Sequence, residues 1–310
     1  MADQRISFVG IRQSKKVTMK ELVIISGKGG TGKTSLLGAF ASLAENKVLC
    51  DADVDAADLH LIMNPTVKER HDFQSGHDAV INAEKCTQCG LCRDLCRWNA
   101  VREDFTIDPL DCEGCGVCVY FCPEKAIDFP TKTCGEWYIS DTRFGPMVHA
   151  RLGIAEENSG KLVTQVRQEA KKLADAKGLQ LILTDGPPGV GCPVIASLGG
   201  ANAVLIVTEP TLSGRHDMER VAQLADFFRV PVMVCVNKAD LNLDATSDIR
   251  RFSEEKNYAF LGTIPFDPVF TKAMVAAQTI FEYDNRTEAA EAVRKIWQKL
   301  ARSLEFHEGR

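Results

Sequence analysis

The chain has 310 residues, of which 45% are hydrophobic and 25% charged, a composition typical of globular proteins and not of disordered or fibrous ones. Its 37 Lys and Arg residues against 42 Asp and Glu residues leave a formal net charge of -5, so nucleic acid is not the default partner. No apolar run approaches the ~18 residues of a membrane span, and residues 1–18 lack the apolar core of a secretory signal. These features predict a cytoplasmic protein with no transmembrane segment.

Short apolar runs alternate with longer amphipathic stretches along most of the chain, which is typical of β-α units around a parallel sheet. The runs predict strands at 22–26, 48–51, 179–184, 203–208, 231–236 and 260–264. Helices are predicted between them, for example at 216–228. A last helix, 288–304, is predicted to pack on the sheet, with membrane contact as the alternative. We therefore predict an α/β fold with a doubly wound, mostly parallel sheet.

A glycine-rich loop lies between the first predicted strand and a helix. Residues 27–34 read GKGGTGKT and match the phosphate-binding pattern G-x-x-x-x-G-K-[ST]. Backbone N–H groups of such a loop surround phosphate oxygens, Lys33 would pair with the β and γ phosphates, and the Thr34 hydroxyl would bind Mg²⁺. The alternative is a glycine-rich turn without a ligand. The predicted nucleotide-binding residues here are Gly27, Lys28, Gly29, Gly30, Thr31, Gly32, Lys33 and Thr34.

Polar motifs follow three later predicted strands, where open parallel sheets bind ligands. Residues 51–58 read DADVDAAD, and residues 185–189 read DGPPG. Taken singly, each could also be an Asp that caps a helix or a turn. Residues 237–240 read NKAD, which predicts a base-recognition loop, with a polar turn as the alternative. Because NKAD also fits the guanine-reading pattern NKxD, this motif alone leaves ATP and GTP open.

The alternation stops between residues 80 and 130, where eight of the 12 cysteines lie, and this segment is predicted to be a small inserted domain. Two C-x2-C-x2-C-x3-C runs have the spacing of two-cluster ferredoxins, in which the fourth cysteine of each run binds the other cluster. Zinc is the alternative metal. One departure from the pattern is Arg97, which stands where a Pro often follows the fourth cysteine. The predicted ligands are Cys86, Cys89, Cys92 and Cys122 for one 4Fe-4S cluster, and Cys112, Cys115, Cys118 and Cys96 for the other.

The loop KGGTGKT, residues 28–34, resembles the KGGxGK[ST] loop of the MinD/ParA-type deviant P-loop ATPases. The resemblance implies a nucleotide-dependent homodimer in which Lys28 reaches the partner's ATP. It makes Lys28, Lys33 and Asp53 the catalytic residues, with Asp53 orienting the attacking water in switch I. It also implies that Asp185 lies near Mg²⁺, that Gly189 in switch II lies near the γ-phosphate, and that Asn237 contacts adenine.

The phosphate-binding loop and the two cysteine runs, together with segments 142–163, 185–197 and 208–217, resemble MinD-superfamily ATPases that carry an inserted ferredoxin domain. The break in the β-α alternation and the start of the first strand divide the chain into an N-terminal extension (1–18), a first ATPase part (19–79), the insert (80–130) and a second ATPase part (131–310). The resemblance implies ATP, Mg²⁺, two 4Fe-4S clusters, ATP hydrolysis that is slow without a partner, and a redox or iron-sulfur partner protein that the sequence does not name.

Three roles remain open from the sequence. The first is an ATP-gated electron carrier or redox-responsive switch. The second is an iron-sulfur carrier, and the third is a positioning ATPase with a redox sensor. Eight thiolates within one chain favour electron transfer or sensing over cluster delivery, because carriers typically share exposed clusters across a dimer.

Overall fold

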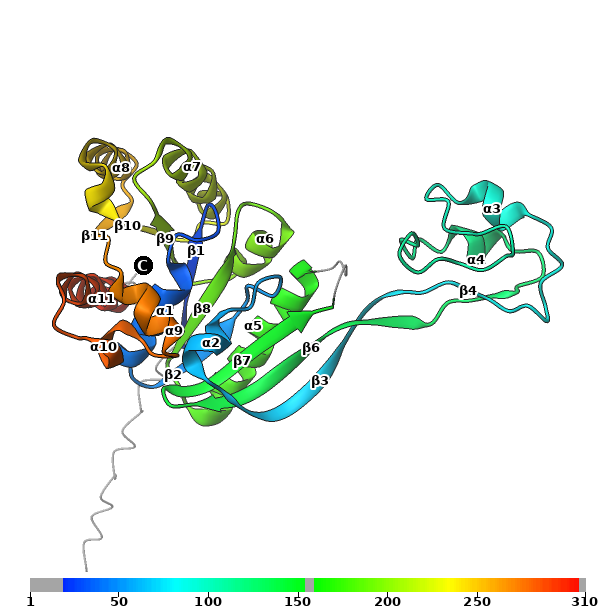
Figure 1. The fold of residues 1–310 in the computed structure, drawn as a ribbon, viewed down its shortest axis with the longest axis horizontal. Helices are drawn as coiled ribbons and strands as arrows, with labels where there is room; N and C mark the ends of the chain where they lie inside the picture. Colours follow the sequence, from blue (N-terminus) through cyan, green and yellow to red (C-terminus); the bar gives the residue numbers. More distant parts are fainter. Residues whose placement is uncertain (1–18, 154–158, 307–310) are drawn as a thin grey trace, which may run out of the picture.

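The computed structural model describes residues 19–153 and 159–306, with side chains described up to residue 304. The predicted N-terminal extension, 1–18, lies outside the described residues. The chain forms a helix-covered sheet from which a long two-stranded arm extends, and a small module lies at the far end of the arm (Figure 1). We call residues 78–130, between the two arm strands, the Cys-rich module.

The central sheet has nine strands, and its core is parallel, as predicted. Strands β9, β1, β8 and β2 pair in parallel in the middle of the sheet, and β1 is buried along nearly its whole length. In spatial order the strands are β11 (Ala259–Ile264), β10 (Val232–Asn237), β9 (Ala203–Thr208), β1 (Lys20–Ser26), β8 (Leu181–Pro188), β2 (Lys47–Asp51), β7 (Gly145–Leu152), β6 (Thr131–Thr142) and β3 (Thr66–His77).

Helices cover both faces of the sheet, because alternate residues of the buried strands present apolar side chains to each side. One face carries α1 (Lys33–Leu43), α2 (Leu59–Met63), α9 (Val269–Val275), α10 (Ile280–Tyr283) and α11 (Glu288–Phe306). The other face carries α5 (Ser159–Lys177), α6 (Cys192–Leu198), α7 (Leu212–Phe227) and α8 (Leu243–Glu255). A 3-10 turn, η1 (Ala239–Leu241), follows β10.

Helix α11 packs on the sheet, as predicted. Val293, Ile296 and Leu300 lie on its buried face, and the Trp297 ring lies 5.2 Å from the Phe40 ring of α1. The apolar stripe of this helix is therefore occupied by the protein core and not presented to a membrane. None of the helices in the described part of the chain combines the length and apolar character needed to span a bilayer.

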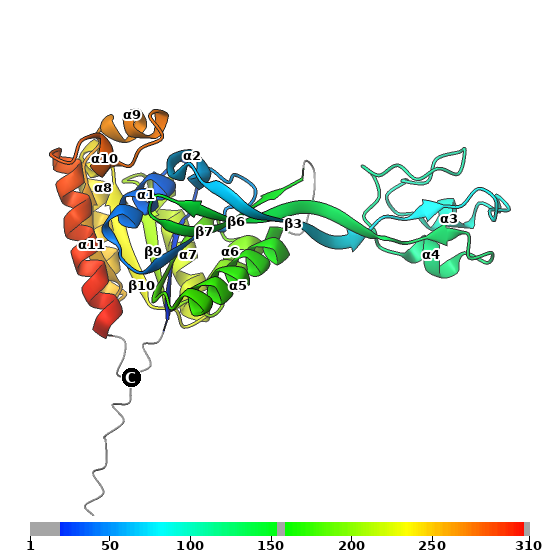
Figure 2. The same ribbon diagram turned by 90° about the horizontal axis from the view of Figure 1, so that it is seen from below.

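The arm consists of β3 and β6, which pair antiparallel (Figure 2). The sequence analysis did not predict these strands: the side chains of β3 are mostly exposed and polar or charged, and β6 is a mainly half-buried strand of mixed polar and aromatic residues without a clear apolar alternation. Cross-strand contacts hold them together instead, including the Arg70–Glu136 ion pair and the stacked rings of His71 and Trp137, 4.0 Å apart.

The Cys-rich module has little regular structure. It contains one short antiparallel pair, β4 (Val80–Ile81) with β5 (Ile127–Asp128), and two single-turn helices, α3 (Leu91–Leu95) and α4 (Val117–Phe121). Each of these helices follows a glycine in the left-handed region and lies within one of the two cysteine runs. The module therefore repeats one local motif twice, as the duplicated spacing predicts.

Candidate functional site

The glycine-rich loop joins β1 to α1 and is packed closely against helix α7 and the end of strand β10. A Cβ on Gly32 would lie 2.4 Å from Asn237 Nδ2, and a Cβ on Gly27 would lie 2.2 Å from the Cβ of Asp217. Gly32 also has a φ of 88°, in the left-handed region that favours glycine. Glycine is therefore required at both positions, and Asp217 of α7 and Asn237 at the end of β10 limit the path of the backbone.

A cavity of about 430 Å³ opens over this loop at the carboxyl ends of the strands. It is large enough for a small ligand and has the position that ligands take in open parallel sheets. The Thr31 hydroxyl is buried and has no hydrogen-bond partner among the described residues, so a polar group is still needed there. The cavity is lined by Gly29, Gly30, Thr31, Gly32, Lys33, Thr34, Asp53, Asn237, Lys238, Phe266 and Phe270, among others.

Lys33 lies at the centre of a buried polar cluster at the floor of the cavity. Its Nζ donates to Asp185 Oδ1 at 2.8 Å and to Asp53 Oδ2 at 3.1 Å. The Thr34 hydroxyl donates to the other oxygen of Asp185 at 2.7 Å. Burial alone would lower the pKa of Lys33, but the negative charges of Asp185 and Asp53 outweigh it and raise the pKa. Lys33 is thus a permanent cation where phosphates would bind.

Asp51 is a member of this cluster to which the sequence analysis assigned no role. It pairs with Asp185 in the parallel register of β2 and β8, and its oxygens accept hydrogen bonds from the backbone N–H groups of Asp53 and Leu59. Burial, followed by the charge of Asp185, raises the pKa of Asp51 well above its ordinary value. Asp51, Asp53 and Asp185 thus place three carboxyl groups beside the single Lys33.

Asn237 and Asp240, from the NKAD motif, both make contacts within the protein. The Asn237 amide donates to the Thr31 carbonyl at 2.7 Å, so this residue supports the phosphate-binding loop while lining the cavity. Asp240 accepts a hydrogen bond from the Phe266 backbone N–H at 2.5 Å. That contact occupies one oxygen of the carboxylate that would read guanine in an NKxD loop.

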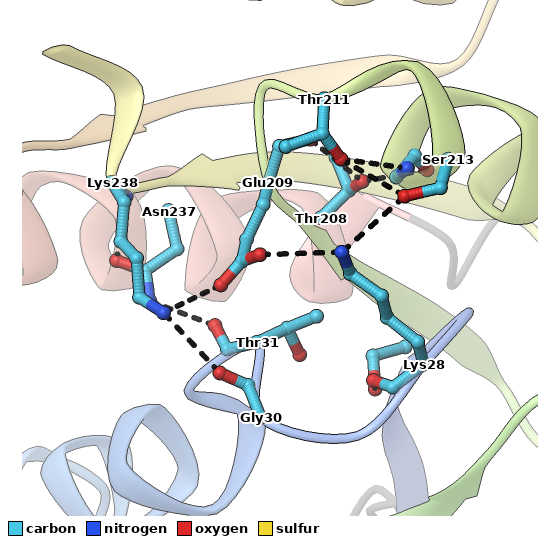
Figure 3. A network of polar contacts seen from close by, with 11 residues as sticks. Lys28, Gly30, Thr31, Thr208, Glu209, Thr211, Ser213, Asn237 and Lys238 are labelled. Carbon is cyan, nitrogen blue, oxygen red and sulfur yellow. Dashed lines mark hydrogen bonds and ion pairs between the residues drawn. The ribbon is translucent and has the colours of Figure 1, made fainter. Parts of the chain in front are cut away.

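Glu209 lies between two lysines beside the loop (Figure 3). Its Oε1 accepts from Lys238 Nζ at 2.5 Å, and its Oε2 lies 3.5 Å from Lys28 Nζ. Lys28 also donates to the Ser213 hydroxyl at 3.4 Å. Lys28, the residue predicted to reach a partner's nucleotide, therefore contacts its own chain. The sequence analysis included Glu209 in the segment 208–217 but assigned it no role.

Gly189 lies directly after β8, on the other side of the loop. Its backbone N–H donates to the Ser26 carbonyl at 2.9 Å, and its φ is 92°. The neighbouring Pro188 lines the cavity. The structure thus brings the DGPPG segment next to the end of β1, where a γ-phosphate would be expected from the sequence analysis.

Two separate cavities lie in the Cys-rich module, and each is lined by four of the eight cysteines. The first is lined by Cys86, Cys89, Cys92 and Cys122, and the second by Cys96, Cys112, Cys115 and Cys118. Three cysteines of each set come from one run and the fourth from the other run. This is the grouping that the sequence predicted for the ligands.

Thiols are the ligand type of both iron-sulfur clusters and structural zinc, so the residue types of these two sets suit a metal. All eight thiols are free, and apolar residues such as Phe105 and Trp98 lie beside them in the cavity walls. Backbone N–H groups donate to Cys86 Sγ at 3.4 Å and to Cys122 Sγ at 3.3 Å.

No group of three or more His, Cys, Asp or Glu side chains in the described ranges is arranged to hold a metal ion. A Mg²⁺ ion beside Thr34 and Asp185 would thus need oxygens from a nucleotide and from water, which is the usual way in which Mg²⁺ binds with phosphates. The absence of a preformed metal site extends to the cysteines of the Cys-rich module, which lie in the described ranges: the four thiols of each set line one cavity but are not gathered around a metal position.

Arg143 links the arm to the nucleotide side of the sheet. It lies in the turn between β6 and β7, and its guanidinium donates to the Met63 and Ile62 carbonyls at 2.9 and 2.8 Å, at the end of α2. It also donates to the Ala277 carbonyl and pairs with Glu282 of α10. Strand β3 follows α2 directly in the chain, and Arg143, which follows β6, donates hydrogen bonds to the end of α2. Both arm strands are therefore connected to α2 at the base of the arm.

Residues 22–280 match the family model of the CobQ/CobB/MinD/ParA nucleotide binding domain. An uncharacterized protein of Methanocaldococcus jannaschii is 33% identical over 285 residues, which cover 90% of this chain and 96% of that protein.

Two solved structures share the fold at low sequence identity. The septum site-determining protein MinD complexed with Mg-ADP, from Pyrococcus horikoshii, is 16% identical, with a TM-score of 0.57 over 94% of this chain and 100% of that one. A chain of the MinC:MinD cell division protein complex of Aquifex aeolicus is 19% identical, with a TM-score of 0.54 over 91% and 96%.

Proposed function

Since the chain belongs to the CobQ/CobB/MinD/ParA nucleotide-binding family and is a P-loop ATPase, we propose that it couples ATP binding and hydrolysis to the redox state of two 4Fe-4S clusters in the Cys-rich module. The protein would act as an ATP-gated electron carrier or a redox-responsive switch. The observation that carries this proposal is the sorting of eight cysteines into two four-thiol cavities.

The nucleotide part of the proposal rests on the cluster around Lys33. When Mg-ATP enters, the phosphates offer Lys33 a new anionic partner, and its contacts to Asp53 and Asp185 are released. Thr34 and Asp185 are already 2.7 Å apart and would face Mg²⁺ together. Asp53 is then free to orient the attacking water, and Gly189 lies beside the end of β1 to contact the γ-phosphate.

The base and dimer assignments are also proposals. Asn237 lines the cavity and is proposed to contact adenine beside the phosphate-binding loop. The Asp240 contact to Phe266 supports ATP over GTP, because a guanine-reading carboxylate must be free. Lys28 is proposed to act across a nucleotide-dependent homodimer, on the phosphates held by the partner.

The cluster part of the proposal assigns ligands across the two runs. Cys86, Cys89, Cys92 and Cys122 would hold one cluster, and Cys112, Cys115, Cys118 and Cys96 the other. A 4Fe-4S cluster supplies reversible one-electron chemistry. The chain's own contribution would be apolar walls around both cysteine sets and backbone donors to Cys86 and Cys122 in the first set, features that would tune the potential of a bound cluster.

The test is the metal content and the effect of single cysteine variants. Anaerobically purified protein should hold about eight iron atoms per chain and show a reducible 4Fe-4S signal. Cys122→Ala should disturb the cluster of Cys86, Cys89 and Cys92 and leave the other intact. Cys192→Ala, which changes an exposed cysteine outside the module, is the matched control.

Two results would overturn the cluster assignment. A preparation that contains zinc and no iron under anaerobic conditions would show that the module is a zinc site. Selective loss of the cluster bound by Cys112, Cys115 and Cys118 in Cys122→Ala would show that ligands do not cross between the runs.

A further inference from the structure

Glu209 holds two cations at the edge of the phosphate-binding loop (Figure 3). One carboxylate oxygen accepts from Lys238 at 2.5 Å and the other lies 3.5 Å from Lys28. Lys238 Nζ also reaches the Gly30 carbonyl at 3.4 Å, so this lysine connects Glu209 to the loop itself. The Glu209 side chain is 15% exposed, against 37% for Lys28, so the anion is the more enclosed member of this pair.

The segment that carries Glu209 is held in place by local contacts. The Thr208 hydroxyl donates to the Gly214 carbonyl at 2.9 Å, and the Thr211 hydroxyl accepts from the Gly214 N–H at 2.9 Å to cap α7. A Cβ on Gly214 would lie 2.4 Å from the Glu209 carbonyl oxygen. The carboxylate is therefore presented to Lys28 from a packed turn.

The negative charge of Glu209 gives Lys28 and Lys238 an anionic partner beside this loop, as a phosphate group would. Lys28 cannot contact Glu209 and Ser213 of its own chain and also extend to another molecule. Lys238 would remain paired with Glu209 after Lys28 leaves, so the release does not strand a buried negative charge. The contact can thus open without a large penalty.

We propose that Glu209 is a positioning residue that retains Lys28 within its own chain until a nucleotide-loaded partner competes for it. Glu209 would thereby set the threshold for nucleotide-dependent dimerisation. This inference rests on the proposed action of Lys28 across a homodimer.

The test is a double-variant comparison of Glu209→Gln and Lys28→Ala by sedimentation with Mg²⁺ and a non-hydrolysable ATP analogue. Glu209→Gln keeps the shape of the side chain and removes its charge, so it should tighten dimerisation about 2- to 5-fold, the range for a partly exposed ion pair. In the Lys28→Ala background the same change should have no effect. Glu254→Gln, which removes a surface charge from an ion pair with Arg250, is the control.

Each outcome separates this inference from the proposed function. If wild type does not dimerise, or if Lys28→Ala dimerises as wild type does, the proposed dimer or the trans role of Lys28 fails. If Lys28→Ala is impaired but Glu209→Gln dimerises no better than wild type, the inference about Glu209 fails. An equal gain in both backgrounds would also overturn it. Glu209→Asp, which keeps the charge, should restore wild-type behaviour in part and guards against a folding artefact.

Discussion

Lys33 is the residue on which the nucleotide site depends, because it is a buried cation shared by Asp53 and Asp185. We expect Lys33→Ala to abolish tight nucleotide binding, since the phosphates lose their buried positive partner. Lys28→Ala should spare much of the binding by a single chain and reduce hydrolysis and dimerisation. Isothermal titration with Mg-ATP distinguishes the two variants. An equal loss of binding in both would argue against a trans role for Lys28.

Asp53 is expected to contribute to hydrolysis and not to nucleotide binding. Asp53→Asn should still bind Mg-ATP, because Lys33, Thr34 and Asp185 are unchanged. Hydrolysis should fall on the order of 10²-fold, since orientation of the attacking water is what this carboxylate would contribute. Binding and single-turnover hydrolysis are measured on the same preparation. Unchanged hydrolysis would remove Asp53 from the catalytic residues.

His149 predicts a pH dependence of stability. Its Nε2 lies 2.9 Å from the Ser140 hydroxyl, and burial, followed by the charge of His60, lowers its pKa from 6.5 to about 4. Between those values the unfolded chain binds a proton at this residue and the folded chain does not. His149 therefore makes the folded state lose stability as the pH falls from about 6.5 to about 4.

The expected size of this effect is about 2 kcal/mol between pH 7.5 and pH 4.5. Urea unfolding of wild type and of His149→Gln at both pH values measures it, because the difference between the two proteins cancels the other titrating groups. Wild type should lose more stability than the variant over this range. Parallel pH profiles would show that His149 titrates normally in the folded protein.

At the scale of elements, Arg143 connects the arm to α2. Helix α2 has only five residues, and the Arg143 guanidinium supplies donors for two of its last carbonyls. Arg143→Ala should therefore increase amide exchange in α2 by about 10-fold or more, the effect of losing hydrogen bonds to a charged group. Hydrogen-exchange mass spectrometry makes the measurement.

The matched control is Arg70→Ala, which removes the exposed ion pair with Glu136 on the arm. This change should leave the exchange of α2 as it is in wild type. If Arg143→Ala and Arg70→Ala both leave α2 unchanged, Arg143 does not support the helix and the arm is not attached there.

The elements that the sequence predicted and those that it missed differ in burial. Strands β1, β9 and β10 are buried and apolar, so their hydrophobic runs identify them in the sequence. The P-loop motif identifies Lys33 and Thr34, and the DGPPG segment at the end of another buried strand identifies Asp185. Arm strand β3 is mostly exposed and polar, and arm strand β6 is half-buried with a mixed composition, so no apolar period marks either strand.

The same limit applies within the site. Asp51 joins the Lys33 cluster through the register of β2 against β8, and Glu209 meets Lys28 through the packing of the loop after β9. Neither relation is a spacing along the chain. Sequence motifs therefore identified the residues expected to surround the phosphates. Tertiary packing determines the positions of Asp51 and Glu209, which lie beside Lys33 and Lys28, and these positions could not be found from the motifs.

At the scale of the whole molecule, the Cys-rich module is attached to the ATPase sheet through the arm (Figures 1 and 2). The arm begins at α2, which follows the segment of Asp53, and returns to α2 through Arg143. A nucleotide that moves Asp53 and α2 should therefore move the base of the arm. This arrangement offers a physical path between the ATP site and the two cysteine-lined cavities.

By linkage, a nucleotide that shifts the potential of the clusters must itself bind with an affinity that depends on their redox state. The decisive measurement is the Mg-ATP affinity of anaerobic protein in the oxidised and the reduced state, together with cluster potentials with and without nucleotide. For a coupling of ~1 to 3 kcal/mol, the account predicts affinities that differ on the order of 5- to 150-fold and a matching shift in potential. Identical affinities and identical potentials would contradict it and leave the module as a passive attachment.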